Sequence, residues 1–126
     1  DAYTSQYFKL NRAYAEQFGD RWLILSAKYG FLEPDQKIEN YNVSFKKKSS
    51  RPISDKELKN QVKTKKLGEY DKVVVLGGEE YYQKVKMAFA NTNSIIASPL
   101  RGLPIGLRMA RIRDAILKGK ELEEML

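Results

Sequence analysis

The sequence contains no cysteine and no histidine, and these two absences exclude whole classes of chemistry. Without cysteine, these residues can form neither a disulfide bond nor a thiolate metal site. Without histidine, they cannot form a Ser-His-Asp triad, a Cys-His pair or an imidazole metal site. Any metal would need oxygen ligands alone, and any proton transfer would use Asp, Glu, Lys or Tyr. We therefore predict no metal site and no cofactor.

Long apolar runs are also absent. No run approaches the roughly 18 apolar residues that a membrane-spanning helix needs. The chain opens with Asp1 and Ala2 and shows neither the charged nor the apolar region of a signal peptide. We therefore expect a cytoplasmic protein with no membrane partner. Its 126 residues, which show no internal repeat and no linker, predict one domain over 1–126.

Acidic residues are fewer than basic ones, 16 against 23, which leaves a net charge of +7. Such a charge favours an anionic partner, most simply nucleic acid, with DNA preferred. Nine of the basic residues fall between Lys46 and Lys66, although a run of charge can also be a merely solvated face. The predicted nucleic-acid patch consists of Lys46, Lys47, Lys48, Arg51, Lys59, Lys63, Arg108 and Arg111.

Helical and strand patterns alternate along the chain. The apolar spacing predicts helices near 3–18, 54–67, 79–90 and 105–118, strands at 21–26, 72–76 and 94–97, and a loop at 27–35. Buried strands that alternate with helices are typical of a parallel sheet. The fold class is therefore α/β, a small three-layer (αβα) domain with a mostly parallel sheet. Because a helix comes first, we expect that a further strand precedes Asp1.

The carboxyl ends of parallel strands are where ligands bind in such sheets. Three loops, at 26–30, 77–80 and 98–102, leave those ends and are expected to converge. Lys28, Glu79 and Asp35 are the candidate acids or bases. The candidate ligand-binding residues are Ser26, Tyr29, Gly30, Tyr41, Gly77, Gly78, Arg101 and Gly102. Each has a structural alternative, such as a tight turn at Gly77 and Gly78, a solvated Lys28 or a surface ion pair at Arg101.

Several blocks of the sequence resemble a known family. The block from Leu25 to Asp35, continued by Ile38-Glu39-Asn40-Tyr41, is similar to one in a prokaryotic domain family of unknown function. That family is distantly similar to the peroxide-stress protein YaaA. Further agreement covers Tyr3-Thr4-Ser5, Arg12-x-Tyr14-Ala15, Gly78-x-x-Tyr81 and Pro99-Leu100-x-Gly102-Leu103-x-Ile105-Gly106. Asn40 departs from the pattern, because relatives often have proline there.

The resemblance implies an α/β domain with a site where these motifs meet, and it adds Tyr81 to the candidate ligand-binding residues. YaaA-like proteins are associated with DNA binding and with protection from oxidative DNA damage. Family members usually begin with a strand and a segment that contains Cys or Ser together with Lys, which this sequence lacks. The resemblance supplies no established reaction.

Three functional hypotheses remain open. The first is a nucleic-acid-associated domain of the YaaA-like kind, with action on a base or nucleotide as a possible extension. The second is an enzyme whose substrate is a small nucleobase, nucleoside or nucleotide, which would use Lys28, Glu79 or Asp35 as acid or base. The third is a non-catalytic interaction module. We favour the first.

Overall fold

The structure, a computed structural model, describes residues 6–35, 45, 49 and 51–122 together with the helical backbone of 2–5. Its elements are α1 (Ala2–Phe18), β1 (Ile24–Ser26), β2 (Gly30–Leu32), α2 (Asp55–Thr64), the short 3-10 helix η2 (Leu67–Glu69), β3 (Lys72–Val74), α3 (Glu79–Ala88), β4 (Ile95–Ala97) and α4 (Ile105–Lys118). The α/β class is confirmed. None of the helices in this part of the chain is both long and apolar enough to cross a membrane.

The described strands form two separate pairs. β3 and β4 run parallel, with Val73 opposite Ile96. β1 instead pairs antiparallel with β2, with Leu25 opposite Phe31. Among the described residues β1 does not join the β3–β4 pair, so the single sheet expected from the sequence is not formed there. The three-layer arrangement stays a prediction.

The β1–β2 hairpin corrects the prediction of a loop at 27–35. The Ser26 hydroxyl accepts hydrogen bonds from the backbone N–H groups of Lys28 and Tyr29, at 3.2 and 3.1 Å. Gly30 has a φ of +80°, which L side chains rarely adopt. These two features reverse the chain within a few residues, and Gly30–Leu32 then pairs back on β1. A periodicity test cannot detect a strand of three residues.

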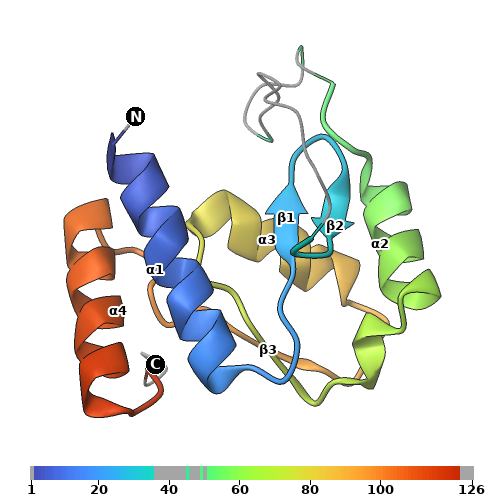
Figure 1. The fold of residues 1–126 in the computed structure, drawn as a ribbon. Helices are drawn as coiled ribbons and strands as arrows, with labels where there is room; N and C mark the ends of the chain where they lie inside the picture. The colour runs from blue at the N-terminus through green and yellow to red at the C-terminus, as the bar shows by residue number, and fades with distance from the viewer. Residues whose placement is uncertain (1, 36–44, 46–48, 50, 123–126) are drawn as a thin grey trace.

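Two apolar clusters form the core. One lies between the hairpin, α2 and α3 and includes Phe31, Leu58 and Phe89. The other joins α1 and α4 around Leu100 and Ile112, both 0% exposed. In Figure 1, α1 and α4 lie side by side at one end of the molecule, α2 lies at the other, and the strands and α3 lie between them.

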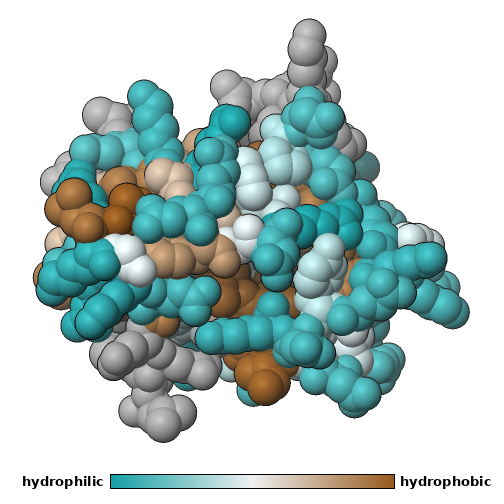
Figure 2. Space-filling view, turned by 60° about the horizontal axis from the view of Figure 1, so that its bottom comes forward, coloured by the Kyte–Doolittle hydropathy of each residue, from teal (hydrophilic) through white to brown (hydrophobic). Residues whose placement is uncertain are grey.

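The β3–β4 pair is less covered than the sequence predicts. A near-continuous apolar run favours a strand buried on both faces, yet Val74 is 40% exposed and Ile95 is 63% exposed. Figure 2, which brings the underside of Figure 1 forward, shows apolar surface between hydrophilic side chains. Within the described residues, this pair is therefore only partly enclosed.

The helix ends follow their capping chemistry. Ser54 with Glu57 three residues later is a capping-box pattern that predicts a helix start, and Ser54 does cap α2: its hydroxyl accepts from the Glu57 N–H at 3.1 Å. Gly19 and Gly119 follow apolar helical patterns and predict helix ends, and α1 and α4 do end directly before them. Thr4 and Ser5 are residue types that commonly begin helices, yet both lie inside α1. The helix expected over 54–67 ends at Thr64, four residues before Gly68.

Candidate functional site

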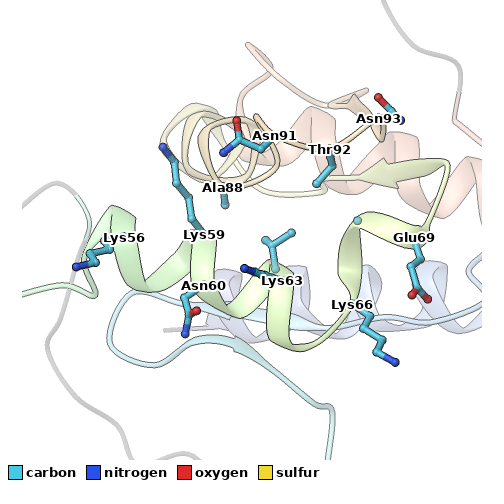
Figure 3. Close-up of a pocket in the computed structure, with 12 residues that line it drawn as sticks. Lys56, Lys59, Asn60, Lys63, Lys66, Glu69, Ala88, Asn91, Thr92 and Asn93 are labelled. Atoms are coloured by element: carbon cyan, nitrogen blue, oxygen red, sulfur yellow. The ribbon is translucent and has the colours of Figure 1, made fainter.

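A cleft with a volume of about 680 Å³ lies between α2 and the loop that joins α3 to β4. Its lining residues are Lys56, Lys59, Asn60, Val62, Lys63, Lys66, Gly68, Glu69, Ala88, Asn91, Thr92 and Asn93. We call it the lysine cleft (Figure 3). It sits at the amino ends of β3 and β4, because η2 precedes β3 and Asn91–Asn93 precede β4. This is the edge opposite the one on which the sequence prediction placed the site.

One wall of the lysine cleft is the exposed face of α2. Lys56, Lys59 and Lys63 follow one another at steps of three and four residues, so they share a face of the helix. Leu58 and Val62 lie on the adjoining face of the helix and are buried, and Val62 also lines the cleft. The same amphipathic pattern thus anchors α2 in the core and turns its lysines outward.

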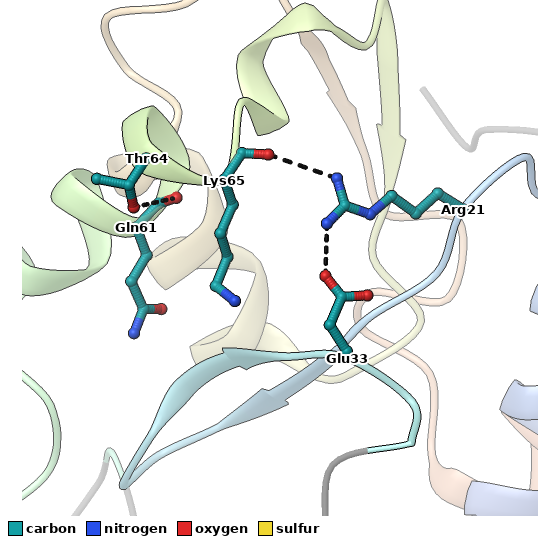
Figure 4. A network of polar contacts seen from close by, with 5 residues as sticks. All are labelled: Arg21, Glu33, Gln61, Thr64 and Lys65. Atoms are coloured by element: carbon teal, nitrogen blue, oxygen red, sulfur yellow. Dashed lines mark hydrogen bonds and ion pairs between the residues drawn. The ribbon is translucent and has the colours of Figure 1, made fainter.

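The position of α2 is fixed by polar contacts with the hairpin. The Gln61 side chain donates to the Tyr29 carbonyl at 2.9 Å and accepts from the Phe31 N–H at 2.8 Å. Arg21 ion-pairs with Glu33 at 2.5 Å, and its guanidinium also donates to the Lys65 carbonyl at 3.4 Å (Figure 4). The hydrogen bond to Glu33 is the largest cause that raises the pKa of Arg21. α2 is therefore held at its middle and at its end.

The other wall is the segment Asn91–Asn93. The Thr92 hydroxyl donates to the Phe89 carbonyl at 2.7 Å and accepts from the Ser94 N–H at 3.3 Å. A Cβ atom on Gly68 would lie 2.7 Å from Thr92 Cγ2, so a larger residue there would displace this wall. The exposed amides of Asn91 and Asn93 are thus carried by a segment with a defined position.

The lysine cleft carries unbalanced positive charge. Within the part of the chain that the structure describes, none of its four lysines forms an ion pair. Glu69 is the one carboxylate among the described lining residues. Unpaired ammonium groups opposite neutral amides make a surface suited to an anion that also accepts and donates hydrogen bonds.

A second group of polar side chains lies at the carboxyl ends of β3 and β4. The Arg101 guanidinium carbon lies 4.3 Å from the centroid of the Tyr82 ring, and its Nε lies 3.7 Å from a carboxylate oxygen of Glu79. We call Glu79, Tyr82, Arg101 and Arg108, with Gly78, the strand-end cluster. It brings together three residues that the sequence proposed for one site, namely Gly78, Glu79 and Arg101.

Arg108 closes the strand-end cluster from α4. Its Nε donates to the Leu103 carbonyl at 2.6 Å, and its guanidinium nitrogens lie 3.3 and 3.4 Å from where a Cβ on residue 78 would stand. Gly78 therefore leaves room for this guanidinium. Gly77 likewise leaves room for Tyr81, whose Cβ would lie 3.0 Å from a Cβ on residue 77.

Two neighbours of the strand-end cluster have unusual environments. Burial raises the pKa of the Tyr81 hydroxyl above its ordinary value of 10.0, and the Glu80 carboxylate raises it further. The Ser98 hydroxyl oxygen, directly after β4, is buried and has no hydrogen-bond partner among the described residues. Buried polar atoms usually have a partner, which marks this edge as a second candidate site.

The remaining predicted residues lie elsewhere or are not described. Lys28, Tyr29 and Gly30 form the hairpin turn, with the Lys28 ammonium 5.4 Å from the centroid of the Tyr29 ring. This turn is hydrogen-bonded to α2, whereas Glu79 contacts Arg101 and Gln83. Asp35 and Gly102 are exposed. The residues that fall outside the described part of the chain are Tyr41, Lys46, Lys47 and Lys48.

The predicted nucleic-acid patch is divided between elements. Lys59 and Lys63 line the lysine cleft, whereas Arg108 and Arg111 lie on α4. Arg51 is exposed before α2. Sequence reasoning missed the cleft residues Asn60, Asn91, Thr92 and Asn93. The polar segment before β4 was the available signal, but it lies at the amino edge of the strands, where a parallel sheet does not usually bind ligands.

Neither the lysine cleft nor the strand-end cluster offers a set of metal ligands among the described residues. Among the described residues, no group of three or more His, Cys, Asp or Glu side chains is arranged to hold a metal ion. The lysine cleft offers ammonium and amide groups, and the strand-end cluster offers one carboxylate already close to an arginine. The groups at both places can make contacts through charge and hydrogen bonds.

Comparison with known proteins gives a family and one curated relative. The chain is 34% identical over 124 residues to the "Uncharacterized protein YfjM" of Bacillus subtilis (strain 168). The aligned residues make up 97% of this chain and 82% of that protein. No solved structure matches the chain. The model described as "Family of unknown function (DUF6884)" matches residues 1–114. The distant similarity to YaaA stays a prediction, whereas the resemblance to a family of unknown function is confirmed, and this protein belongs to the DUF6884 family.

Proposed function

We propose that this protein is a nucleic-acid-associated α/β domain that contacts its partner through the lysine cleft. The observation that carries the proposal is the row of lysines on the exposed face of α2, none of which is in an ion pair within the described residues. Lysines that neutralise phosphates release counterions, and this electrostatic term supplies most of the affinity of non-specific binding.

Two further observations agree with the proposal. The net charge of +7 steers the protein toward polyanions. The sequence blocks from Leu25 to Tyr41 and from Pro99 to Gly106 resemble a family of unknown function that is distantly similar to YaaA, and YaaA-like proteins are associated with DNA binding. We therefore favour DNA as the partner.

A salt titration tests the proposal. We expect affinity for a labelled DNA, followed by fluorescence anisotropy, to fall steeply between about 50 and 200 mM salt. The logarithm of the binding constant should fall linearly with the logarithm of the salt concentration. An affinity that does not change over this range, or no binding at low salt, would contradict a function based on phosphate contacts.

The strand-end cluster favours a second candidate function, binding or conversion of a nucleobase, nucleoside or nucleotide. The specific observation is the buried Ser98 hydroxyl without a described partner, close in sequence to an arginine stacked on Tyr82. Saturable binding of a nucleoside triphosphate, measured by calorimetry, tests it. If the strand-end cluster binds the nucleotide, Arg101→Gln should weaken nucleotide binding and Lys59→Gln should not. The reverse pattern would assign the nucleotide to the lysine cleft.

A further inference from the structure

We infer that the lysine cleft takes the backbone of a double-stranded nucleic acid, with one strand's phosphates along α2 and the amides of Asn91 and Asn93 on the other side. The inference rests on the proposed function and adds which form of nucleic acid binds and where.

The spacing of the lysines is the first step. Lys56 and Lys63 are seven residues apart on one helix, which corresponds to about 10 Å along its axis. Each strand of a duplex carries one phosphate per roughly 3.4 Å of duplex axis, so about three phosphates fall within that length when α2 lies parallel to this axis. Lys56, Lys59 and Lys63 thus match a duplex strand with one ammonium group per phosphate.

The chemistry of the lining is the second step. Proteins that hold single strands combine a basic groove with aromatic rings on which the bases stack. None of the described residues that line the cleft is aromatic, so the cleft offers no stacking surface. A duplex keeps its bases stacked on one another and presents its phosphates outward, which suits a cleft of lysines and amides.

The far wall supplies the third step. Figure 3 shows Lys59 extending from α2 toward the wall that carries Asn91. Asparagine amides hydrogen-bond to phosphate and sugar oxygens or to base edges. Because Thr92 is hydrogen-bonded to Phe89 and Ser94, the segment that carries both asparagines has a defined position. A partner in the cleft is therefore contacted from two sides.

The experiment compares two triple variants on a labelled DNA duplex and on its single strand. The cleft variant is Lys56→Gln, Lys59→Gln, Lys63→Gln. The matched control is Lys9→Gln, Lys72→Gln, Lys120→Gln, which removes the same charge from exposed lysines outside the cleft. Thermal melts check that both variants are folded. We expect that both are, because all six substituted side chains are exposed.

We expect the unmodified protein to bind the duplex more tightly than the single strand. The cleft variant should lose affinity by on the order of tenfold or more, and its salt slope should fall by about three, one for each phosphate that no longer meets an ammonium group. The control should keep most of its affinity. Asn91→Asp with Asn93→Asp, which places two carboxylates opposite the lysines, should weaken duplex binding without a loss of lysine charge.

The outcomes separate the two proposals. An equal loss of duplex affinity in the cleft variant and in the control would overturn the inference that the cleft binds the duplex, whereas the proposal of nucleic-acid binding would stand. Tighter binding of the single strand would overturn the duplex inference in the same way. A protein that binds neither DNA at low salt would instead overturn the proposed function itself.

Discussion

The lysine cleft and the strand-end cluster are both rich in basic side chains, but their positive charges have different surroundings. In the cleft, the lysines face solvent and neutral amides, and none has an ionic partner among the described residues. In the cluster, Arg101 is near Glu79 and stacked on Tyr82. A paired and stacked arginine stabilises its own neighbourhood, whereas unpaired lysines remain available to a partner. The cleft is therefore the region better suited to bind a large anion.

The largest expected effect comes from removing the apolar support of each region. Leu58 lies beneath the α2 lysines and Leu100 precedes Arg101, and both are 0% exposed. Leu58→Ala and Leu100→Ala should each lower the free energy of unfolding by about 2–5 kcal/mol, because each leaves a cavity. Urea denaturation followed by circular dichroism measures this.

Leu117→Ala is the control for these core variants. Leu117 is 86% exposed, so its truncation should change the free energy of unfolding by less than about 0.5 kcal/mol. If Leu58→Ala were no more costly than this control, α2 would not be anchored in the core, and the lysines would not hold the fixed spacing on which the duplex inference depends.

An effect of similar size is expected at Gly30, which sets how α2 meets the hairpin. Gly30 and Gly102 both have a left-handed φ, +80° and +83°. A Cβ on Gly30 would lie 2.2 Å from Gln61 Oε1, whereas a Cβ on Gly102 would meet nothing within 4 Å. Gly102→Ala should therefore destabilise by about 1–2 kcal/mol through backbone strain alone. Gly30→Ala should destabilise by about 1–3 kcal/mol more, through overpacking.

A double-mutant cycle with Gln61→Ala isolates the steric part of this difference. Gln61→Ala alone removes two hydrogen bonds to the hairpin, yet it also removes the atom that the new methyl group would meet. The double variant should therefore be more stable than the sum of the single effects predicts. Strict additivity in thermal melts would show that the new methyl group at residue 30 does not meet the Gln61 side chain.

A modest pH effect is expected at Tyr81, beside the strand-end cluster. Burial raises the pKa of Tyr81 in the folded protein above 10.0, with a further contribution from Glu80. Below pH 10 the hydroxyl is neutral in both the folded and the unfolded protein. As the pH rises above 10, the unfolded chain ionises first, so stability falls until the folded pKa is passed.

Tyr81→Phe removes this titration while it keeps the ring. The variant should lose less stability than the unmodified protein when the pH is raised from 9 to above 10. Urea denaturation at each pH measures the difference, and the contributions of all other groups cancel because both proteins contain them. Parallel curves for the two proteins would show that Tyr81 titrates alike in the folded and unfolded states.

The sequence predicted those parts of the fold that depend on local chemistry. The apolar spacing of α1 and α4, the Ser54 cap and the glycine ends of two helices are each decided within a few residues. The hairpin was not predicted, because its second strand is three residues long and is stabilised by Gln61 from thirty residues away. Which strands pair depends on such long-range contacts.

The candidate sites divide in the same way between local and long-range features. Glu79 and Arg101 were proposed for one site because both follow strands, and the parallel β3–β4 pair brings them together. The lysine cleft was foreseen only as charge, through Lys59 and Lys63. Its second wall, Asn91–Asn93, carries no charge and lies on the less expected edge of the strands. Neutral amides become informative only when the structure shows what they face.

The smallest expected effect distinguishes the two regions most directly. The Arg101 and Glu79 side chains are 44% and 58% exposed, so their interaction contributes at most about 1 kcal/mol, and stacking on Tyr82 contributes about 0.5–1 kcal/mol. Arg101→Gln should therefore lower the free energy of unfolding by no more than about 1–2 kcal/mol. Because this charge is already engaged, its removal should leave duplex affinity and the salt slope nearly unchanged, unlike Lys59→Gln. A slope reduced as much by Arg101→Gln as by Lys59→Gln would mean that both edges of the strand pair contact the same nucleic acid.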